Sequence, residues 1–152
     1  MAGSPAPEAA LPPSIRQVLD RFRAMARDEK MQALVAYAKR LEPVPERLAS
    51  LDREAHTVPE CQTRVDLFSE LQDGRMHFWA DVNVRQSPTV AAFLSITLSA
   101  INGQPPAATL AIPADFVSSM MAGLGLSARE VGLNALVSRL KREAREALDA
   151  GR

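Results

Sequence analysis

An Asp73-Gly74 pair between two segments of alternating hydrophobicity is the feature that most constrains the fold of this chain. Apolar or small side chains occupy every second position before the pair, at Val65, Leu67, Ser69 and Leu71, and after it, at Met76, Phe78, Ala80 and Val82. A period of two on each side of an Asp-Gly turn predicts a β-hairpin. Because a lone hairpin is marginally stable in water, we expect its apolar face to lie against helices, with room for a third strand.

Helical spacing of apolar residues precedes the predicted hairpin. Ser14 is expected to cap a first helix, whose apolar residues are Ile15, Val18, Leu19 and Phe22. A second helix is expected to begin at Asp28 and to end before Pro43, with an apolar side formed by Met31, Leu34, Val35, Ala38 and Leu41. Residues 44–59 are predicted to be irregular, apart from a helical turn around 46–51.

Helical spacing also follows the hairpin. Ser87-Pro88 predicts the start of a helix and Asn102-Gly103 its end. Short helical pieces are predicted over 107–110 and 114–121. A final helix is predicted over 128–148, with Val131, Ala135, Leu136, Leu140, Ala144 and Leu148 available for the core. Helices, a hairpin and further helices together predict an α+β fold, in which a small antiparallel sheet packs against several helices.

The length of 152 residues suits one domain of ordinary size. Residues 1–13 contain four prolines, which break helices, and are expected to form a disordered tail. Residues 14–150 are expected to form the single domain.

Composition excludes several classes of protein. Lys and Arg together number 18, as do Asp and Glu, so the chain lacks the positive excess of a general nucleic-acid or anionic-membrane binder. The most apolar stretch, residues 91–100, is too short to span a bilayer. A single cysteine excludes an internal disulfide and any metal or iron–sulfur site built from this chain's thiolates. We therefore expect a cytoplasmic protein with no nucleic-acid or membrane partner and no bound metal or cofactor.

Few side chains form a pattern that suggests chemistry. The Gly-x-Ser-x-Gly sequence of serine hydrolases is absent, and the two histidines, His56 and His77, are far apart. His77 is expected to share one side of the hairpin with Trp79. Glu143 and Glu146 lie among the arginines of the last predicted helix, which indicates a solvated face. These observations leave little basis for a self-contained hydrolase or transferase.

Cys61 is the exception. Structural cysteines prefer the middle of apolar runs, whereas Cys61 has Glu60, Gln62 and Arg64 as neighbours and follows Pro59 by two residues. A loop that reaches solvent is therefore expected here. Arg64 or a protonated His56 would lower the pKa of the thiol from its ordinary value near 8.5, whereas Glu60 would raise it. These charges leave open whether Cys61 is reactive or incidental.

The order of motifs along residues 15–145 resembles that of the SufE family of sulfur acceptors. The resemblance rests on five segments, which are Leu-Glu-Pro-Val-Pro-Glu at 41–46, Cys-Gln-Thr-x-Val at 61–65, Asp-Val-Asn at 81–83, Ile-Pro-x-x-Phe at 112–116 and Leu-Ser-x-Arg-x-x-Gly-Leu at 126–133. Each segment is weak alone, and their shared order makes the match specific. The resemblance also implies the fold that SufE proteins share with the IscU-type cluster scaffolds.

The resemblance implies a role in iron–sulfur cluster assembly. In SufE-like proteins the cysteine, here Cys61, takes sulfur as a transient persulfide from a SufS-like cysteine desulfurase and stimulates that enzyme. The sulfur then passes to a SufBCD-type scaffold. Pyridoxal phosphate belongs to the desulfurase, so no stand-alone catalysis is expected of this chain. Gln62, Arg129, Asp81 and Asn83 are implied to bind the partner or to support the loop.

Departures from the family pattern concern the apolar helix and the loop before it, which has about two extra residues. The family commonly has Asp-x-Asp there, whereas the second acid is Asn83 in this chain, and Ala92 stands where a glycine is usual. A role as a non-catalytic helical adaptor with an incidental cysteine remains an alternative, as does a stand-alone thiol enzyme such as a peroxidase. The adaptor hypothesis predicts that replacing Cys61 has no effect in any assay.

Overall fold

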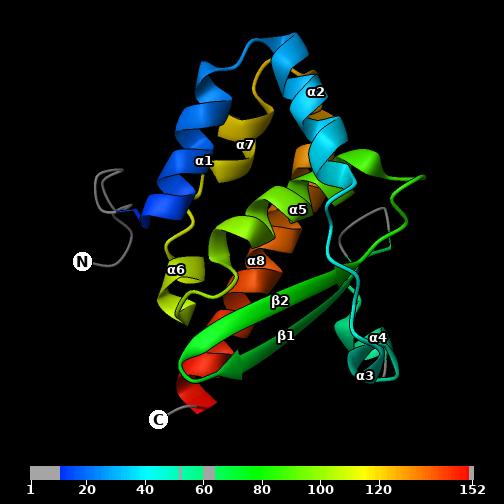
Figure 1. Ribbon diagram of the computed structural model, residues 1–152, viewed down its shortest axis with the longest axis vertical. Helices are drawn as coiled ribbons and strands as arrows, with labels where there is room; N and C mark the ends of the chain where they lie inside the picture. The colour runs from blue at the N-terminus through cyan, green and yellow to red at the C-terminus, as the bar shows by residue number, and fades with distance from the viewer. Residues whose placement is uncertain (1–10, 52, 60–63, 151–152) are drawn as a thin grey trace.

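The computed structural model describes residues 11–51, 53–59 and 64–150. Two strands form one antiparallel hairpin, which lies at one end of the helical part of the molecule (Figure 1). The predicted α+β fold is therefore confirmed. In chain order the elements are α1 (Pro13–Ala24), α2 (Arg27–Ala38), α3 (Glu46–Ala49), α4 (Arg53–His56), β1 (Asp66–Gln72), β2 (Arg75–Asp81), α5 (Pro88–Ile101), α6 (Pro106–Leu110), α7 (Phe116–Met121) and α8 (Ser127–Ala150).

The hairpin closes through a two-residue turn, as the sequence predicts. Gln72 pairs with Arg75 beside the turn, and Asp66 pairs with Asp81 at the other end. Asp73 and Gly74 have φ angles of 54° and 78°, and a turn with both central residues left-handed matches the twist of the strands. Within the described residues the sheet has two strands, and single bridges from Thr57 and Gln104 extend its edges without forming a third.

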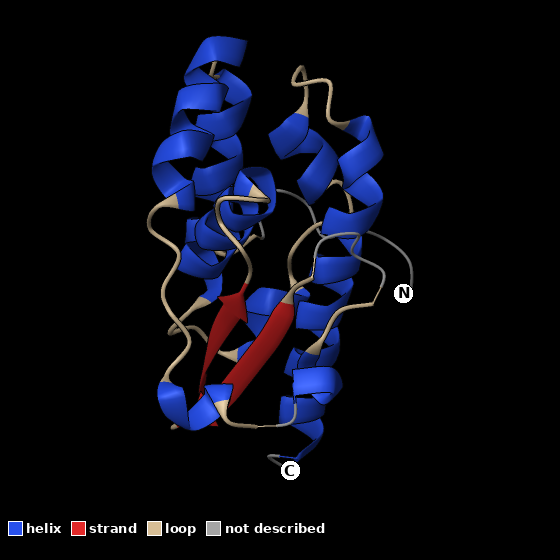
Figure 2. Ribbon diagram, turned by 90° about the vertical axis from the view of Figure 1, so that its right-hand side faces the viewer, coloured by secondary structure: helices blue, strands red, loops and turns tan. Residues whose placement is uncertain are grey.

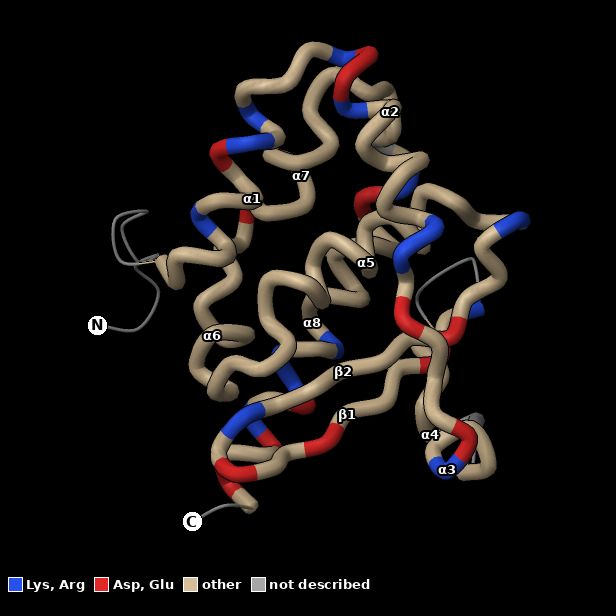
Figure 3. The backbone as a smooth tube through the Cα atoms, viewed as in Figure 1, with Lys and Arg blue, Asp and Glu red and all other residues tan. Residues whose placement is uncertain are grey.

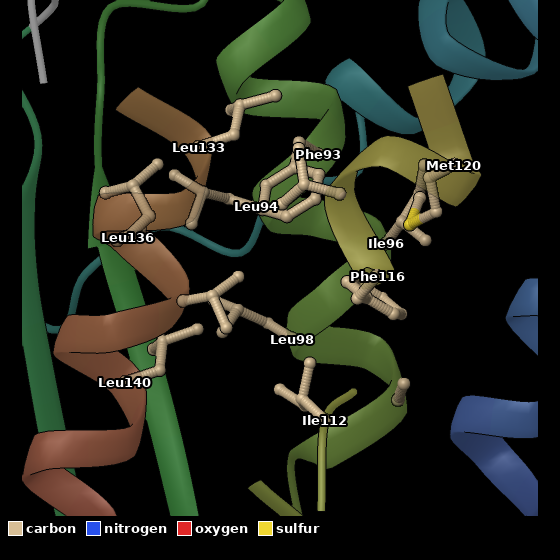
Figure 4. Packing of buried hydrophobic residues seen from close by; sticks show 14 of the residues in the cluster. Phe93, Leu94, Ile96, Leu98, Ile112, Phe116, Met120, Leu133, Leu136 and Leu140 are labelled. Atoms are coloured by element: carbon tan, nitrogen blue, oxygen red, sulfur yellow. The ribbon is translucent and has the colours of Figure 1, made fainter. Parts of the chain in front are cut away.

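Helix α5 is the centre of the hydrophobic core. It contains no charged residue, and in Figure 3 it is drawn entirely in the colour of uncharged residues. Helices α1 and α2 and strand β2 all contact it. Figure 4 shows side chains of α5 between those of α7 and α8, including Phe93, Phe116 and Leu136. A helix that is apolar on every side is stable only when it is buried in this way.

The outer face of the hairpin is also covered. Phe68 and Trp79 pair across the two strands and pack with Leu48 of α3 in a second, smaller cluster. His77 lies on the same face as Trp79, as predicted, with 4.3 Å between the ring centroids. The hairpin therefore lies between α5 and α8 on one side and the short helices that precede β1 on the other (Figure 2). Helix α4, one of these short helices, was not predicted from the sequence.

The expectation for Ser14 is wrong. Helix α1 begins at Pro13, and Pro12 is its N-terminal cap residue. The Ser14 hydroxyl donates to the carbonyl of Ala100, at 2.6 Å, and so joins α1 to α5. Of the predicted tail, residues 1–10 lie outside the described residues, and Leu11 is buried in the core.

Helix α2 buries only part of the predicted apolar side, which is confirmed at Leu34 and Ala38 and wrong at Met31 and Val35. Met31 and Val35 are 44% and 58% exposed, whereas Lys30, Leu34 and Ala38 are buried. The Lys30 ammonium can be buried because it donates to the carbonyl of Ala122, at 2.9 Å.

No helix among the described residues is long and apolar enough to cross a membrane.

Candidate functional site

The two predicted site residues Cys61 and Gln62 lie outside the described residues, but the chain on either side of them is placed. Val58 and Val65 are buried, and the Val58 amide donates to the Val65 carbonyl at 2.9 Å. Thr57 and Asp66 form an antiparallel bridge next to that bond. The chain thus leaves this pairing after Val58 and rejoins it at Val65. We call Thr57, Val58, Val65 and Asp66 the loop base.

The carboxylate of Asp66 joins the two sides of the loop base. Its side chain is only 1% exposed. The Thr57 hydroxyl donates to Oδ1 at 2.5 Å, and Arg64 Nε donates to Oδ2 at 3.4 Å. Burying a carboxylate is costly unless it is hydrogen-bonded, and both of these donors flank the segment that contains Cys61. Sequence reasoning missed Asp66, although an aspartate inside a predicted strand is an available signal because strands disfavour it.

Helix α8 contacts the chain on both sides of the loop base. Arg139 donates from Nη2 to the Ala55 carbonyl at 2.9 Å and from Nη1 to the Thr57 carbonyl at 3.4 Å. Glu143, one helical turn further along, accepts a hydrogen bond from the Ser69 hydroxyl of β1 at 2.7 Å. Arg139 Nε and Glu143 Oε2 are 3.3 Å apart, so the two side chains form an ion pair.

The expected solvated face of α8 is wrong at Glu143. Its side chain is 12% exposed, whereas that of Glu146 is 67% exposed, as predicted. Burial raises the pKa of Glu143, although the hydrogen bond from Ser69 and the charge of Arg139 oppose this change. No local pattern separates the two glutamates, because the partners of Glu143 come from distant parts of the chain.

His56 attaches the end of α4 to the hairpin. Its ring stacks on Phe68 with 4.5 Å between centroids, and Nδ1 lies 3.1 Å from the Leu67 carbonyl oxygen. Residues 55 to 57 are therefore all held, Ala55 and Thr57 by Arg139 and His56 by the hairpin. The segment that leads into the loop is therefore held on one side by the hairpin and on the other by α8.

A groove of about 620 Å³ opens beside the loop base. One wall comes from Ala55, Thr57 and Pro59, and the other is one side of α8, formed by Val131, Asn134, Ala135, Ser138, Arg139 and Arg142. Val131 is 73% exposed, so its predicted place in the core is wrong. Two other residues of α8, Leu133 and Val137, are buried in the core. The result is an accessible groove with an apolar side chain at one end and guanidinium groups at the other.

The structure brings Asp81 to the loop base. Asp81 ends β2 and pairs in register with Asp66. Asn83, two residues later, is exposed and shapes the turn that leads into α5. Its side-chain oxygen accepts from the amide of Gln86 at 3.1 Å, and its carbonyl accepts from that of Ser87 at 2.9 Å. The amide side chain that departs from the family pattern therefore stabilises the turn.

Arg129 does not line the groove. It is exposed in the first turn of α8, four residues before the buried Leu133 and eleven before the buried Leu140. This spacing places Arg129 above the side of the helix that carries Leu133 and Leu140, whereas Val131 and Ser138 lie on the groove side. Arg129 thus lies outside the groove, on a different side of α8. Among the residues that the structure places, no group of three or more His, Cys, Asp or Glu side chains could hold a metal ion.

A family model described as SufE, "Fe-S metabolism associated domain", matches residues 16–144. The match covers most of the chain and associates the domain with iron–sulfur metabolism. The chain belongs to the SufE family.

Two relatives carry the same family name, and a solved structure shares the fold. Two proteins named "Uncharacterized SufE-like protein", from the CDC 1551 and H37Rv strains of Mycobacterium tuberculosis, are each 34% identical over 143 residues, which cover 91% of this chain and 96% of the relative. The solution structure of a hypothetical protein from Thermus thermophilus superposes with a TM-score of 0.77 and 27% identity. That match covers 91% of this chain and 98% of the other.

Proposed function

We propose that the protein is a sulfur acceptor, in which Cys61 takes sulfur from a cysteine desulfurase and passes it to iron–sulfur cluster assembly. The observation that carries the proposal is the SufE family match over residues 16–144, which includes the chain's single cysteine. The groove beside the loop base supports it, because a partner protein could approach there.

The proposed reaction is a thiol exchange. The Cys61 thiolate attacks the terminal sulfur of a persulfide on the desulfurase, and the cysteine thiolate of that enzyme leaves. A new S–S bond forms on Cys61 as the old one breaks, so the transfer needs no external oxidant or reductant. One cysteine suffices, because the second thiol belongs to the partner. The transient persulfide on Cys61 is the only cofactor-like group proposed, and pyridoxal phosphate stays with the desulfurase.

The geometry of the described residues is compatible with such a transfer. Cys61 follows Pro59 by two residues, so covalent geometry keeps their Cα atoms within about 7 Å of each other. Pro59 lines the groove, and its closeness to Cys61 in the sequence supports the proposal that a partner seated there meets the cysteine. We propose that a SufS-like desulfurase docks over this groove and the loop. Gln62, Asp81, Asn83 and Arg129 are proposed to contact the partner or support the loop.

Intact-mass measurement tests the proposal directly. The protein is incubated with a SufS-like desulfurase and L-cysteine, and its mass is compared with that of a sample without the enzyme. The expected result is a gain of one sulfur atom that reducing agent removes and that is absent from Cys61→Ser. The same variant is expected to lose the stimulation of the desulfurase. A Cys61→Ser protein that stimulates the enzyme as well as the wild type does would refute the proposal.

The two alternative hypotheses, a helical adaptor and a thiol peroxidase, make different predictions. A helical adaptor with an incidental cysteine gains no sulfur, and Cys61→Ala has no effect on any of its interactions. A stand-alone thiol peroxidase consumes peroxide without a desulfurase. Transfer onward to a SufBCD-type scaffold, and the cytoplasm as the compartment, are part of the proposal and follow the same family relationship.

A further inference from the structure

Two side chains of α8, one turn apart, hold the chain on both sides of the loop base. Arg139 donates to the carbonyls of Ala55 and Thr57, which precede the Cys61 segment. Glu143 accepts from Ser69 of β1, which follows that segment. The ion pair between Arg139 and Glu143 joins the two contacts. The long helix therefore holds the described chain on both sides of residues 60–63.

Arg139 is suited to this task by its chemistry. A guanidinium is planar and presents its donors in a rigid fork, so it can donate to two carbonyls while its charge faces a carboxylate. A lysine at this position would keep the charge opposite Glu143 but could not reproduce the fork. The Arg139 side chain is 11% exposed, which is far below the 61% of Arg142 on the same helix. Burial at this level indicates a fixed role in the structure, because a guanidinium that needed only solvation would remain on the surface.

The position of Arg139 links it to the groove as well as to the loop base. Arg139 and Thr57 both line the groove. A partner seated there would therefore contact the same side chain that holds the segment leading to Cys61. Ala55 and Thr57 lie six and four residues before Cys61 in the sequence, so their fixation sets the place from which the loop departs.

We propose that Arg139 is a positioning residue for sulfur transfer, which holds the chain before Cys61 against α8 at the edge of the docking groove. This inference rests on the proposed function. Arg139 does not touch the reacting sulfur. It acts by lowering the cost of placing the loop in the partner's site, because a segment that is already fixed loses less conformational freedom on binding.

The test uses Arg139→Gln and Arg139→Lys, with Arg16→Gln as the matched control. Arg16 also pairs with an acid one turn away, Asp20 at 3.9 Å, but the pair is exposed and lies on α1. Amide hydrogen exchange of Val58 in the free protein reports on the loop base, because this amide donates to Val65. We expect exchange at least about tenfold faster in Arg139→Gln, because this variant loses the hydrogen bonds from a charged group to the carbonyls of Ala55 and Thr57. Arg139→Lys should give a smaller increase and Arg16→Gln none.

Sulfur transfer is then measured as a function of acceptor concentration. For Arg139→Gln we expect the half-saturating concentration to rise by about tenfold while the maximal rate is retained. Alkylation of Cys61 by iodoacetamide should proceed at the wild-type rate, because a small reagent needs no docked loop. Arg139→Lys should restore part of the loss.

Three outcomes would overturn the proposal. Unchanged Val58 exchange in both Arg139 variants would show that Arg139 does not hold the loop base. Faster exchange with wild-type transfer kinetics would show that its role is structural alone. A fall in alkylation that matches the fall in transfer would show that Arg139 acts on the thiol itself. Failure of the wild type to gain sulfur is a different result, since it removes the proposed function for every variant.

Discussion

Replacing Asp66 with alanine would remove an acceptor that both sides of the loop base share. The wild-type carboxylate is buried and accepts from the hydroxyl of Thr57, before the loop, and from the guanidinium of Arg64, after it. Alanine leaves the Thr57 hydroxyl without this acceptor. Asparagine keeps an oxygen for Thr57 but loses the charge that attracts Arg64.

The expected cost follows from the burial of each partner. A hydrogen bond to a charged group contributes about 1.5–3 kcal/mol, which applies to the bond from Thr57. The Arg64 side chain is 62% exposed, so solvent screens its pairing, which adds less than about 1 kcal/mol. Asp66→Ala should therefore lower the free energy of unfolding by about 2–4 kcal/mol. Asp66→Asn should cost about 1 kcal/mol, because it keeps the hydrogen bond from Thr57.

Urea unfolding at neutral pH measures these differences, and thermal unfolding checks them. In a chain of this length, a loss of about 3 kcal/mol corresponds to a fall in Tm of roughly 6–12 °C. Asp20→Ala is the control, since Asp20 is 63% exposed and pairs with Arg16 on α1, and it should change stability by less than about 0.5 kcal/mol. An Asp66→Ala protein as stable as this control would refute the account of the loop base. Equal losses in the alanine and asparagine variants would show that the charge matters more than the bond from Thr57.

Three further substitutions test other parts of the fold. Burial raises the pKa of Glu143, so its contribution to stability is fully present below the unfolded-state pKa and is lost as the pH rises through the folded-state pKa. Glu143→Gln lacks this titration and should gain stability relative to the wild type as the pH rises above the ordinary pKa of glutamate, about 4.3, in pH-dependent unfolding. Asn102→Ala should cost about 2 kcal/mol in urea unfolding, because the Asn102 side chain bonds both the amide and the carbonyl of Phe78. Gly74→Ala should cost about 1–2 kcal/mol from its φ of 78° alone, since an added Cβ meets nothing within 4 Å; a neutral result would contradict the observed turn.

The elements predicted most accurately are those whose signals are local. The turn at Asp73-Gly74 depends on two adjacent backbone conformations, and both residues adopt them. The start of α5 at Pro88 is equally local, because the proline ring alone fixes a φ angle that suits the first helical position. By contrast, helical spacing shows that α2 has apolar side chains without showing which of two neighbouring stripes is covered. The exposure of Val35 and the burial of Lys30 depend on where other helices lie.

The candidate site follows the same division. The sequence singled out the cysteine, the acid at Asp81 and the SufE motifs, because each is visible within a few residues. It did not single out Arg139, Glu143 or Asp66 as parts of one arrangement. Ser69 and Glu143 are 74 residues apart, and Ala55 and Arg139 are 84 apart. Only the folded chain brings them together, so no short pattern could predict the contacts.

The two-residue turn and the loop base lie at opposite ends of the hairpin (Figure 1). A strand of seven residues spans about 20 Å, so Asp73 is well removed from the groove. A fluorophore at Asp73, introduced through an unnatural amino acid so that Cys61 stays unmodified, would therefore report complex formation by energy transfer without obstructing the partner. The turn of the hairpin is therefore a suitable attachment point for single-molecule or surface-attached assays.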